Sequence, residues 1–266
     1  MLKKSLVILM VIGTFMISSL AFAEEDASSY PVPMANRPLT LDKGMGEVGL
    51  DILLGLNSGR AAKDIGLGLS FGYGLSDKFE LGVDVLALNY GKDAQGLKFG
   101  GAAVYMTWDF LGFLGLYADI HFPGYTVGGN TYVDSFGDQL LGVTVGLPAT
   151  YTIIDDMLKI HGGLLIDVGF AKEAYATQSL QMALDVELGV TLSLIERLFI
   201  DLTFDAIMAF RPDAGSFGDR TAIPLELTVG YTVIDPMDIY LGFALSDLNG
   251  DGIDSRMLTL GANFRF

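Results

Sequence analysis

The segment from Asp247 to Asp254 reads DLNGDGID and matches the first half of a calcium-binding loop, D-x-N-x-D-G. Asp247, Asn249 and Asp251 would supply oxygen ligands to Ca²⁺. The acid expected at the twelfth position is missing, because residue 258 is Leu. Two interpretations stay open: a Ca²⁺ site, which would be the only cofactor, or a polar hairpin loop rich in turn-forming residues.

Catalysis by a general base would have to use His121 or His161, the two histidines of the chain. Asp119 lies two residues before His121, so in a strand both side chains would point to the same face and one Asp–His pair is available. A phospholipase of the β-barrel class would need a serine two residues after its histidine, where this chain has Pro123 and Gly163. No Ser/His/Asp arrangement stands out, and we predict that the protein is not an enzyme.

In the alternating segments described below, every second residue points to the same face of a strand. Acidic residues dominate one of the two faces, where Lys159 and Arg265 are the main basic residues. Such an excess of acids needs water, cations or shifted pKa values to balance it. Two interpretations stay open: a belt of acids that attracts cations, or a polar network with Tyr105, Tyr117, Thr203 and Tyr240. The belt residues are Asp51, Asp84, Asp119, Glu187, Asp205 and Glu226. Many glycines share this parity, and they either leave space in the interior or ease strand curvature.

The composition excludes several classes of protein. The chain has 266 residues, of which 51% are apolar and 18% charged, so it is too apolar to be disordered. It has no cysteine, which excludes disulfide scaffolds and Cys-ligated metal sites. Its net charge of −16 repels phosphate and argues against nucleic acid as a partner.

The first 23 residues have the pattern of a secretory signal peptide. Lys3 and Lys4 form the positive region, residues 5–20 are almost continuously apolar, and the tripeptide at residues 21–23 is Ala-Phe-Ala. A retained membrane anchor is the alternative, since residues 6–23 are just long enough to span a bilayer. The small-residue cleavage site and the polar residues that follow favour the signal peptide.

Apolar residues of the remaining chain recur with a period of two, as in DVELGVT from Asp185, which predicts β-strands with one apolar face. The alternating runs last about 10 to 14 residues, the length that a tilted strand needs to cross a bilayer. Twelve strands are predicted, near residues 44–56, 64–75, 79–90, 97–109, 113–127, 139–153, 157–170, 178–193, 197–209, 221–233, 237–246 and 255–266.

Short connections at residues 76–78, 111–112, 155–156, 194–196 and 235–236 alternate with longer ones. This alternation is typical of periplasmic turns and extracellular loops, and it predicts that both chain termini lie on the periplasmic side. Aromatic residues of the apolar parity, such as Trp108 and Tyr151, lie near the short turns, as expected for an interfacial girdle. The fold class is therefore all-β: a closed, antiparallel transmembrane barrel spanning residues 44–266.

The signal peptide, the alternating strands and the terminal MLTLGANFRF resemble a bacterial outer-membrane β-barrel protein of the porin or transporter type. The resemblance implies a location in the cell outer membrane among its lipids. It also implies the barrel-assembly machinery as a partner, with Phe264 and Phe266 as the assembly signal. Residues 35–52, ANRPLTLDKGMGEVGLDI, weakly resemble the opening of barrels associated with aromatic-compound degradation.

Residues 24–43 hold three of the eight prolines and do not alternate, so they are not expected to form a barrel strand. They are predicted to be a periplasmic lead-in or a plug in the barrel mouth.

We expect an outer-membrane channel for small polar or cationic solutes. The alternatives are a transporter for hydrophobic or aromatic compounds, which would use inward Leu53, Leu86, Leu88 and Leu165, and a structural or surface-interaction barrel with a blocked lumen.

Overall fold

The computed structural model describes residues 30–56, 65–91, 96–98, 101–122, 139–171, 180–209, 221–248 and 256–266. The predicted signal peptide, residues 1–23, lies outside these ranges. No helix in the described ranges is long and apolar enough to cross a membrane.

The described residues form one antiparallel sheet and a single short 3₁₀ helix, η2 (Met34–Asn36). The strands are β1 (Gly46–Gly55), β2 (Ile65–Ser76), β3 (Phe79–Gly91), β4 (Gly96–Lys98), β5 (Gly101–Asp109), β6 (Gly115–His121), β7 (Gln139–Ile154), β8 (Leu158–Ala171), β9 (Leu180–Ile195), β10 (Leu198–Ala209), β11 (Thr221–Ala222), β12 (Leu225–Ile234), β13 (Met237–Leu245) and β14 (Arg256–Arg265).

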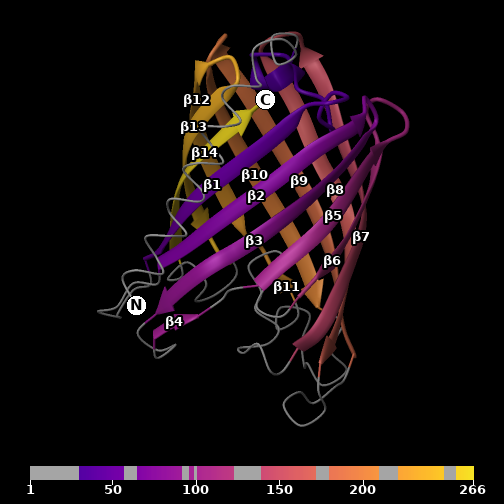
Figure 1. Cartoon of the computed structure of the whole chain (residues 1–266), viewed down its shortest axis with the longest axis vertical. Helices are drawn as coiled ribbons and strands as arrows, with labels where there is room; N and C mark the ends of the chain where they lie inside the picture. Colours follow the sequence, from indigo (N-terminus) through magenta and orange to yellow (C-terminus); the bar gives the residue numbers. More distant parts are fainter. Residues whose placement is uncertain are drawn as a thin grey trace.

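The sheet closes on itself, because β1 pairs with β14 and the other pairings join consecutive strands, apart from β3 with β5 and β10 with β12. The result is the barrel seen in Figure 1. β4 and β5 occupy one position around the ring, and β11 and β12 another, so the fourteen described strands fill twelve positions. The predicted twelve-stranded, closed, antiparallel barrel is confirmed.

The break between β11 and β12 has a simple chemical cause. Pro224 has no N–H group and cannot donate a hydrogen bond to the ladder. The register with β10 nevertheless continues, with Ile207 opposite Ala222 and Phe204 opposite Leu225. The proline therefore interrupts the hydrogen bonds without moving the strand out of its place in the ring.

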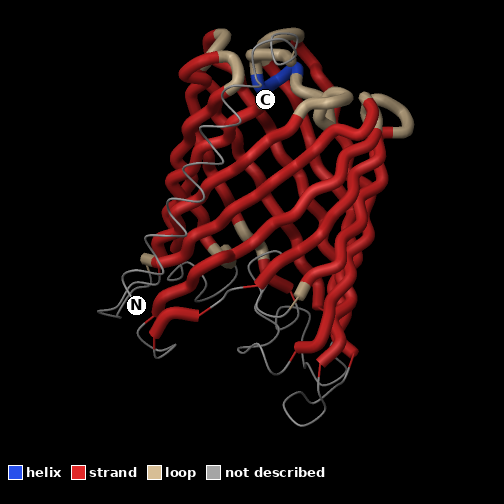
Figure 2. The backbone as a smooth tube through the Cα atoms, in the orientation of Figure 1, coloured by secondary structure: helices blue, strands red, loops and turns tan. Residues whose placement is uncertain are grey.

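All the short turns lie at the end of the barrel that carries the C-terminus and η2, shown at the top of Figure 2. We call this the short-turn end. Asp156, in the turn between β7 and β8, adopts a φ of 62°, a left-handed conformation that Asp tolerates better than most residues. The short turns occur near their predicted positions because their residue types suit tight connections.

Burial follows the predicted alternation. Large apolar side chains point outward and are exposed, among them Leu188, with 64% of its surface accessible. Polar side chains of the opposite parity are buried, including Asp119, Asp167 and Asp238. This arrangement reverses that of a soluble protein, and it suits a barrel with lipid outside and polar contacts inside.

Candidate functional site

The inner wall of the barrel is the candidate site, because the predicted acids lie on the same parity as its buried polar groups. Asp84 and Asp205 form no ion pair with any residue in the described ranges, and the same holds for Asp51, Asp185 and Glu226. Asp205 lies directly opposite Glu187, so these two acids share a level on adjacent strands.

Two residues of the predicted belt, Asp119 and Glu187, lie beside histidines instead of standing free. Asp119 Oδ1 lies 2.8 Å from His121 Nδ1, and Asp167 Oδ1 lies 3.5 Å from the other ring nitrogen. His121 is 1% exposed, so this pair is sealed inside the wall. With carboxylates beside both ring nitrogens, His121 has no accessible face for a substrate.

The second histidine repeats this arrangement. His161 Nε2 lies 2.9 Å from Asp201 Oδ2, and His161 Nδ1 lies 3.4 Å from Glu187 Oε1. Asp201 also accepts a hydrogen bond from Thr191 Oγ1 at 2.6 Å. The inward direction of Asp167 and Asp201 follows from the alternation of their strands. Their pairing with histidines was not predicted, because it depends on which residues meet across three strands.

The proposed network of tyrosines, Thr203 and acids is present in part. Tyr240 donates a hydrogen bond to Asp51 across 2.5 Å, and Tyr105 donates one to Glu80 across 2.9 Å. Tyr117 donates in the same way to Asp119, and Thr203 to Asp201. The acids of the wall therefore differ in their partners: Asp119 and Asp201 lie beside histidines, whereas Asp51 bonds a tyrosine and forms no ion pair within the described ranges.

Glycines on the inner wall make room for the large polar side chains. A Cβ atom on Gly142 would overlap the ring of His121, one on Gly189 would overlap His161, and one on Gly261 would overlap Tyr240. Each large side chain thus crosses a glycine on the neighbouring strand and reaches an acid on the strand after it. One interpretation of the sequence was that such glycines leave open space in the interior. At these three positions the space is filled by the neighbouring large side chain.

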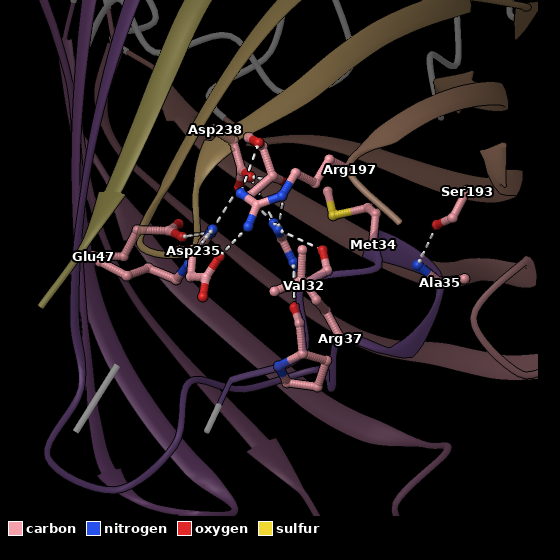
Figure 3. A network of polar contacts seen from close by, with 12 residues as sticks. Val32, Met34, Ala35, Arg37, Glu47, Ser193, Arg197, Asp235 and Asp238 are labelled. Carbon is pink, nitrogen blue, oxygen red and sulfur yellow. Dashed lines mark hydrogen bonds and ion pairs between the residues drawn. The ribbon is translucent and has the colours of Figure 1, made fainter. Parts of the chain in front are cut away.

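At the short-turn end, Asp238 binds two arginines (Figure 3). Arg37 lies 2.5 Å from Asp238 through Nη1 and 3.0 Å through Nη2, while Arg265 Nη1 lies 2.8 Å away. Arg265 also binds Glu47 at 3.0 Å, and Thr232 donates a hydrogen bond to Asp238 at 2.6 Å. Arg37 was missed in the sequence, since the segment that carries it has no periodic pattern to place it.

The ring of Tyr30 lies beside both arginines, with its centroid 5.8 Å from Arg37 and 5.3 Å from Arg265. Burial, with the charge of Glu47 as a smaller contribution, raises the pKa of the Tyr30 phenol above its usual range. The tyrosine therefore stays neutral and presents a ring face to the two cations.

Comparison with known proteins rests on solved structures, since no family model and no curated protein matches the chain. The NanC porin aligns with a TM-score of 0.56 and 12% identity, over 81% of this chain and 98% of its own. An outer-membrane channel of Pseudomonas putida F1 aligns with a TM-score of 0.51 and 14% identity, over 91% and 100%. The fold is that of outer-membrane porins and channels.

A third porin with this fold, KdgM, was solved in complex with a disordered oligogalacturonate. It aligns with a TM-score of 0.50 and 8% identity, over 83% of this chain and 99% of its own. Identities this low establish the architecture and leave the solute undecided. The predicted resemblance to outer-membrane β-barrels is confirmed at the level of the fold.

The C-terminal residues of this porin-type barrel lie at the seam where the ring closes. Gly46 and Phe266 exchange two backbone hydrogen bonds, of 2.7 and 2.9 Å. The rings of Phe264 and Phe266 stack, with centroids 6.4 Å apart and planes 18° apart. Their role as an assembly signal stays a prediction.

The predicted calcium loop is described only in part, because Asn249 and Asp251 lie outside the described residues. Asp247 Oδ1 accepts a hydrogen bond from the backbone N–H of Ile223 at 2.8 Å. Among the described residues, no group of three or more acids and histidines is arranged to hold a metal ion. The Ca²⁺ site stays a prediction.

Inward leucines were the candidate pocket for a hydrophobic solute. Leu53 and Leu165 are half-buried, and Leu165 packs close to where a Cβ of Gly146 would lie. The side chains of Leu86 and Leu88 lie outside the described part of the chain. The alternative of a transporter for hydrophobic compounds therefore stays a prediction.

Proposed function

We propose that the protein is an outer-membrane channel through which small polar or cationic solutes diffuse along an acidic lumen. The fold supports the general channel role, because porins of similar architecture are outer-membrane channels. By the rule that short turns face the periplasm, the short-turn end is the periplasmic end.

The proposed preference for cations over anions rests on a group of inner-wall acids that have no basic partner among the described residues. Asp51, Asp84, Asp185, Asp205 and Glu226 come from five different positions around the ring. Fixed negative charges in a narrow passage with low-dielectric walls concentrate cations and exclude anions. The same charges would repel an acidic sugar oligomer such as the oligogalacturonate bound by KdgM.

The test is the reversal potential of the purified protein in a planar bilayer under a KCl gradient. We expect the sign of cation selectivity, and we expect D84N/D205N to shift the potential toward zero. Asp119 is left intact in this variant, because it is buried and holds His121, so its loss would disturb the wall itself.

The matched control is D155N/E196Q, which removes two acids from exposed turns at the short-turn end. It should leave the reversal potential close to that of the unmodified protein. An open channel that prefers anions, or one in which both double variants behave alike, would contradict the proposal.

A further inference from the structure

Residues 30–45, which precede β1, carry several buried side chains even though they form no barrel strand. Ala35 is fully buried, and Thr40, Leu41 and Met45 are at most 5% exposed. Figure 2 shows this segment, with η2 in blue, at the short-turn end of the barrel. A loose lead-in would stay in solvent, so this burial needs partners on the barrel wall.

On one side of the ring the segment binds β2 and β3. The backbone N–H of Leu41 donates to Glu80 at 2.9 Å, and Gly44 N–H donates to Gly74 O at 2.8 Å. The chain passes so close to Gly74 that a Cβ there would overlap the backbone of Asp42. Glycine at this position therefore makes space for the segment.

Further around the ring the segment binds β7, β8 and β9. Lys159 Nζ donates to Met34 O at 3.0 Å, and Thr152 Oγ1 donates to Ala35 O at 2.9 Å. The N–H of Ala35 donates to Ser193 Oγ at 3.1 Å. These partners satisfy the backbone groups of η2 that a short helix leaves without internal bonds.

A third anchor lies on β12 and β13, where Arg37 binds Thr232 and Asp238. Within the ring, β3, β9 and β13 are separated from one another by intervening strands. A single segment that touches all three must cross the mouth of the barrel.

We propose that residues 30–45 are a plug across the short-turn end, and that the Arg37–Asp238 ion pair is the contact that keeps it closed. The gating role rests on the proposed channel function, whereas the position of the plug does not. The plug regulates passage through the acidic lumen by opening and closing one mouth.

The Arg37–Asp238 ion pair can break without leaving Asp238 unpaired, so it is compatible with a plug that moves out of the barrel mouth. Breaking a buried ion pair is costly when it strands one charge without a partner. Asp238 would keep Arg265 at 2.8 Å and Thr232 at 2.6 Å after Arg37 departs, so the remaining charge stays compensated. The segment also continues into β1 beyond Met45, which would tether it when it opens.

The first test measures access to the plug without using conductance. The chain has no cysteine, so Leu41→Cys provides a single thiol. We expect slow labelling of this buried thiol by a membrane-impermeant reagent, and labelling faster by about tenfold or more when Arg37→Ala is added. Lys43→Cys, at an exposed position of the same segment, gives the rate for an open site. Arg37→Lys, which keeps the charge, should restore much of the protection.

The second test measures current. Arg37→Ala should raise the conductance several-fold, whereas Arg197→Ala should leave it unchanged. Arg197 is the matched control, because it lies at the same end but pairs with Asp235 in the turn between β12 and β13.

A third measurement leaves Arg37 in place. Asn36→Cys and Asp156→Cys stand where side chains now lie 2.6 Å apart, and a short bifunctional thiol reagent can bridge them. The bridged protein should stay at low conductance until the bridge is cleaved.

The outcomes separate the two proposals. Leu41→Cys labelled as fast as Lys43→Cys in the otherwise unmodified protein would overturn the plug, as would full conductance with the bridge intact. Fast labelling of the Arg37→Ala variant without any current would support the proposed plug and overturn the proposed channel function.

Discussion

Asp238 connects two parts of the chain that are far apart in the sequence. It is 2% exposed and binds Arg37 from the N-terminal segment and Arg265 from the last strand. Two cations beside one carboxylate also require a second acid nearby, and Glu47 supplies it from β1. The seam of the barrel and the segment in its mouth are thereby joined through one residue.

Gly142 offers a test of the packing of the inner wall. A methyl group there would overlap the imidazole of His121, which is buried between Asp119 and Asp167. We expect Gly142→Ala to lower the free energy of unfolding by about 1–3 kcal/mol, the usual range for overpacking. Denaturant unfolding in detergent micelles measures this change.

Gly163→Ala is the matched control for that variant, because the added methyl would lie at ordinary contact distances, 3.4 Å from Leu165 Cδ1, 3.5 Å from Pro148 Cα and 3.6 Å from Leu147 O. Its effect should stay within about 0.5 kcal/mol. Equal effects of the two substitutions would show that the position of His121 does not depend on the missing side chain.

Among the elements, β14 closes the ring, because it pairs with β1 on one side and with β13 on the other. Its register continues past Arg265 to Phe266, whose N–H and C=O both bond to Gly46. The last residue of the chain is therefore part of the seam.

Replacing Phe266 with Asp should reduce the amount of assembled protein in the outer membrane, because a charged side chain replaces the ring stacked on Phe264. Phe266→Tyr, which keeps the ring, should assemble normally. The fraction of folded barrel can be followed by its heat-modifiable migration on gels. Unchanged levels of the Asp variant would argue against a C-terminal recognition signal.

For the molecule as a whole, closure places acids from distant parts of the sequence on one inner wall, which the proposed channel function makes the lining of the passage. Their combined field should fade with salt, because the screening length falls from about 10 Å at 0.1 M to about 3 Å at 1 M. We therefore expect the cation preference to be clear in dilute KCl and weak in concentrated KCl. Selectivity that does not change with salt would point to the size of the pore in place of its charge.

The sequence by itself determined the elements of this protein and their faces. Alternation with a period of two reports which side of a strand meets lipid, so the twelve barrel strands, the short turns and the inward parity of Asp167, Asp201 and Asp238 could all be predicted. The break before Pro224 could also have been read from the missing N–H group.

Only the tertiary structure decided what these inward residues touch. His121 meets Asp167 across β7, and His161 meets Asp201 across β9, because the register sets the level of each strand relative to the next. The alternation of apolar and polar residues shows which face a side chain is on, but it does not show how far each strand is shifted along its neighbour. Residues 30–45 have no periodicity at all, and they cross the mouth because backbone groups and one arginine find partners there that exist only once the ring has closed.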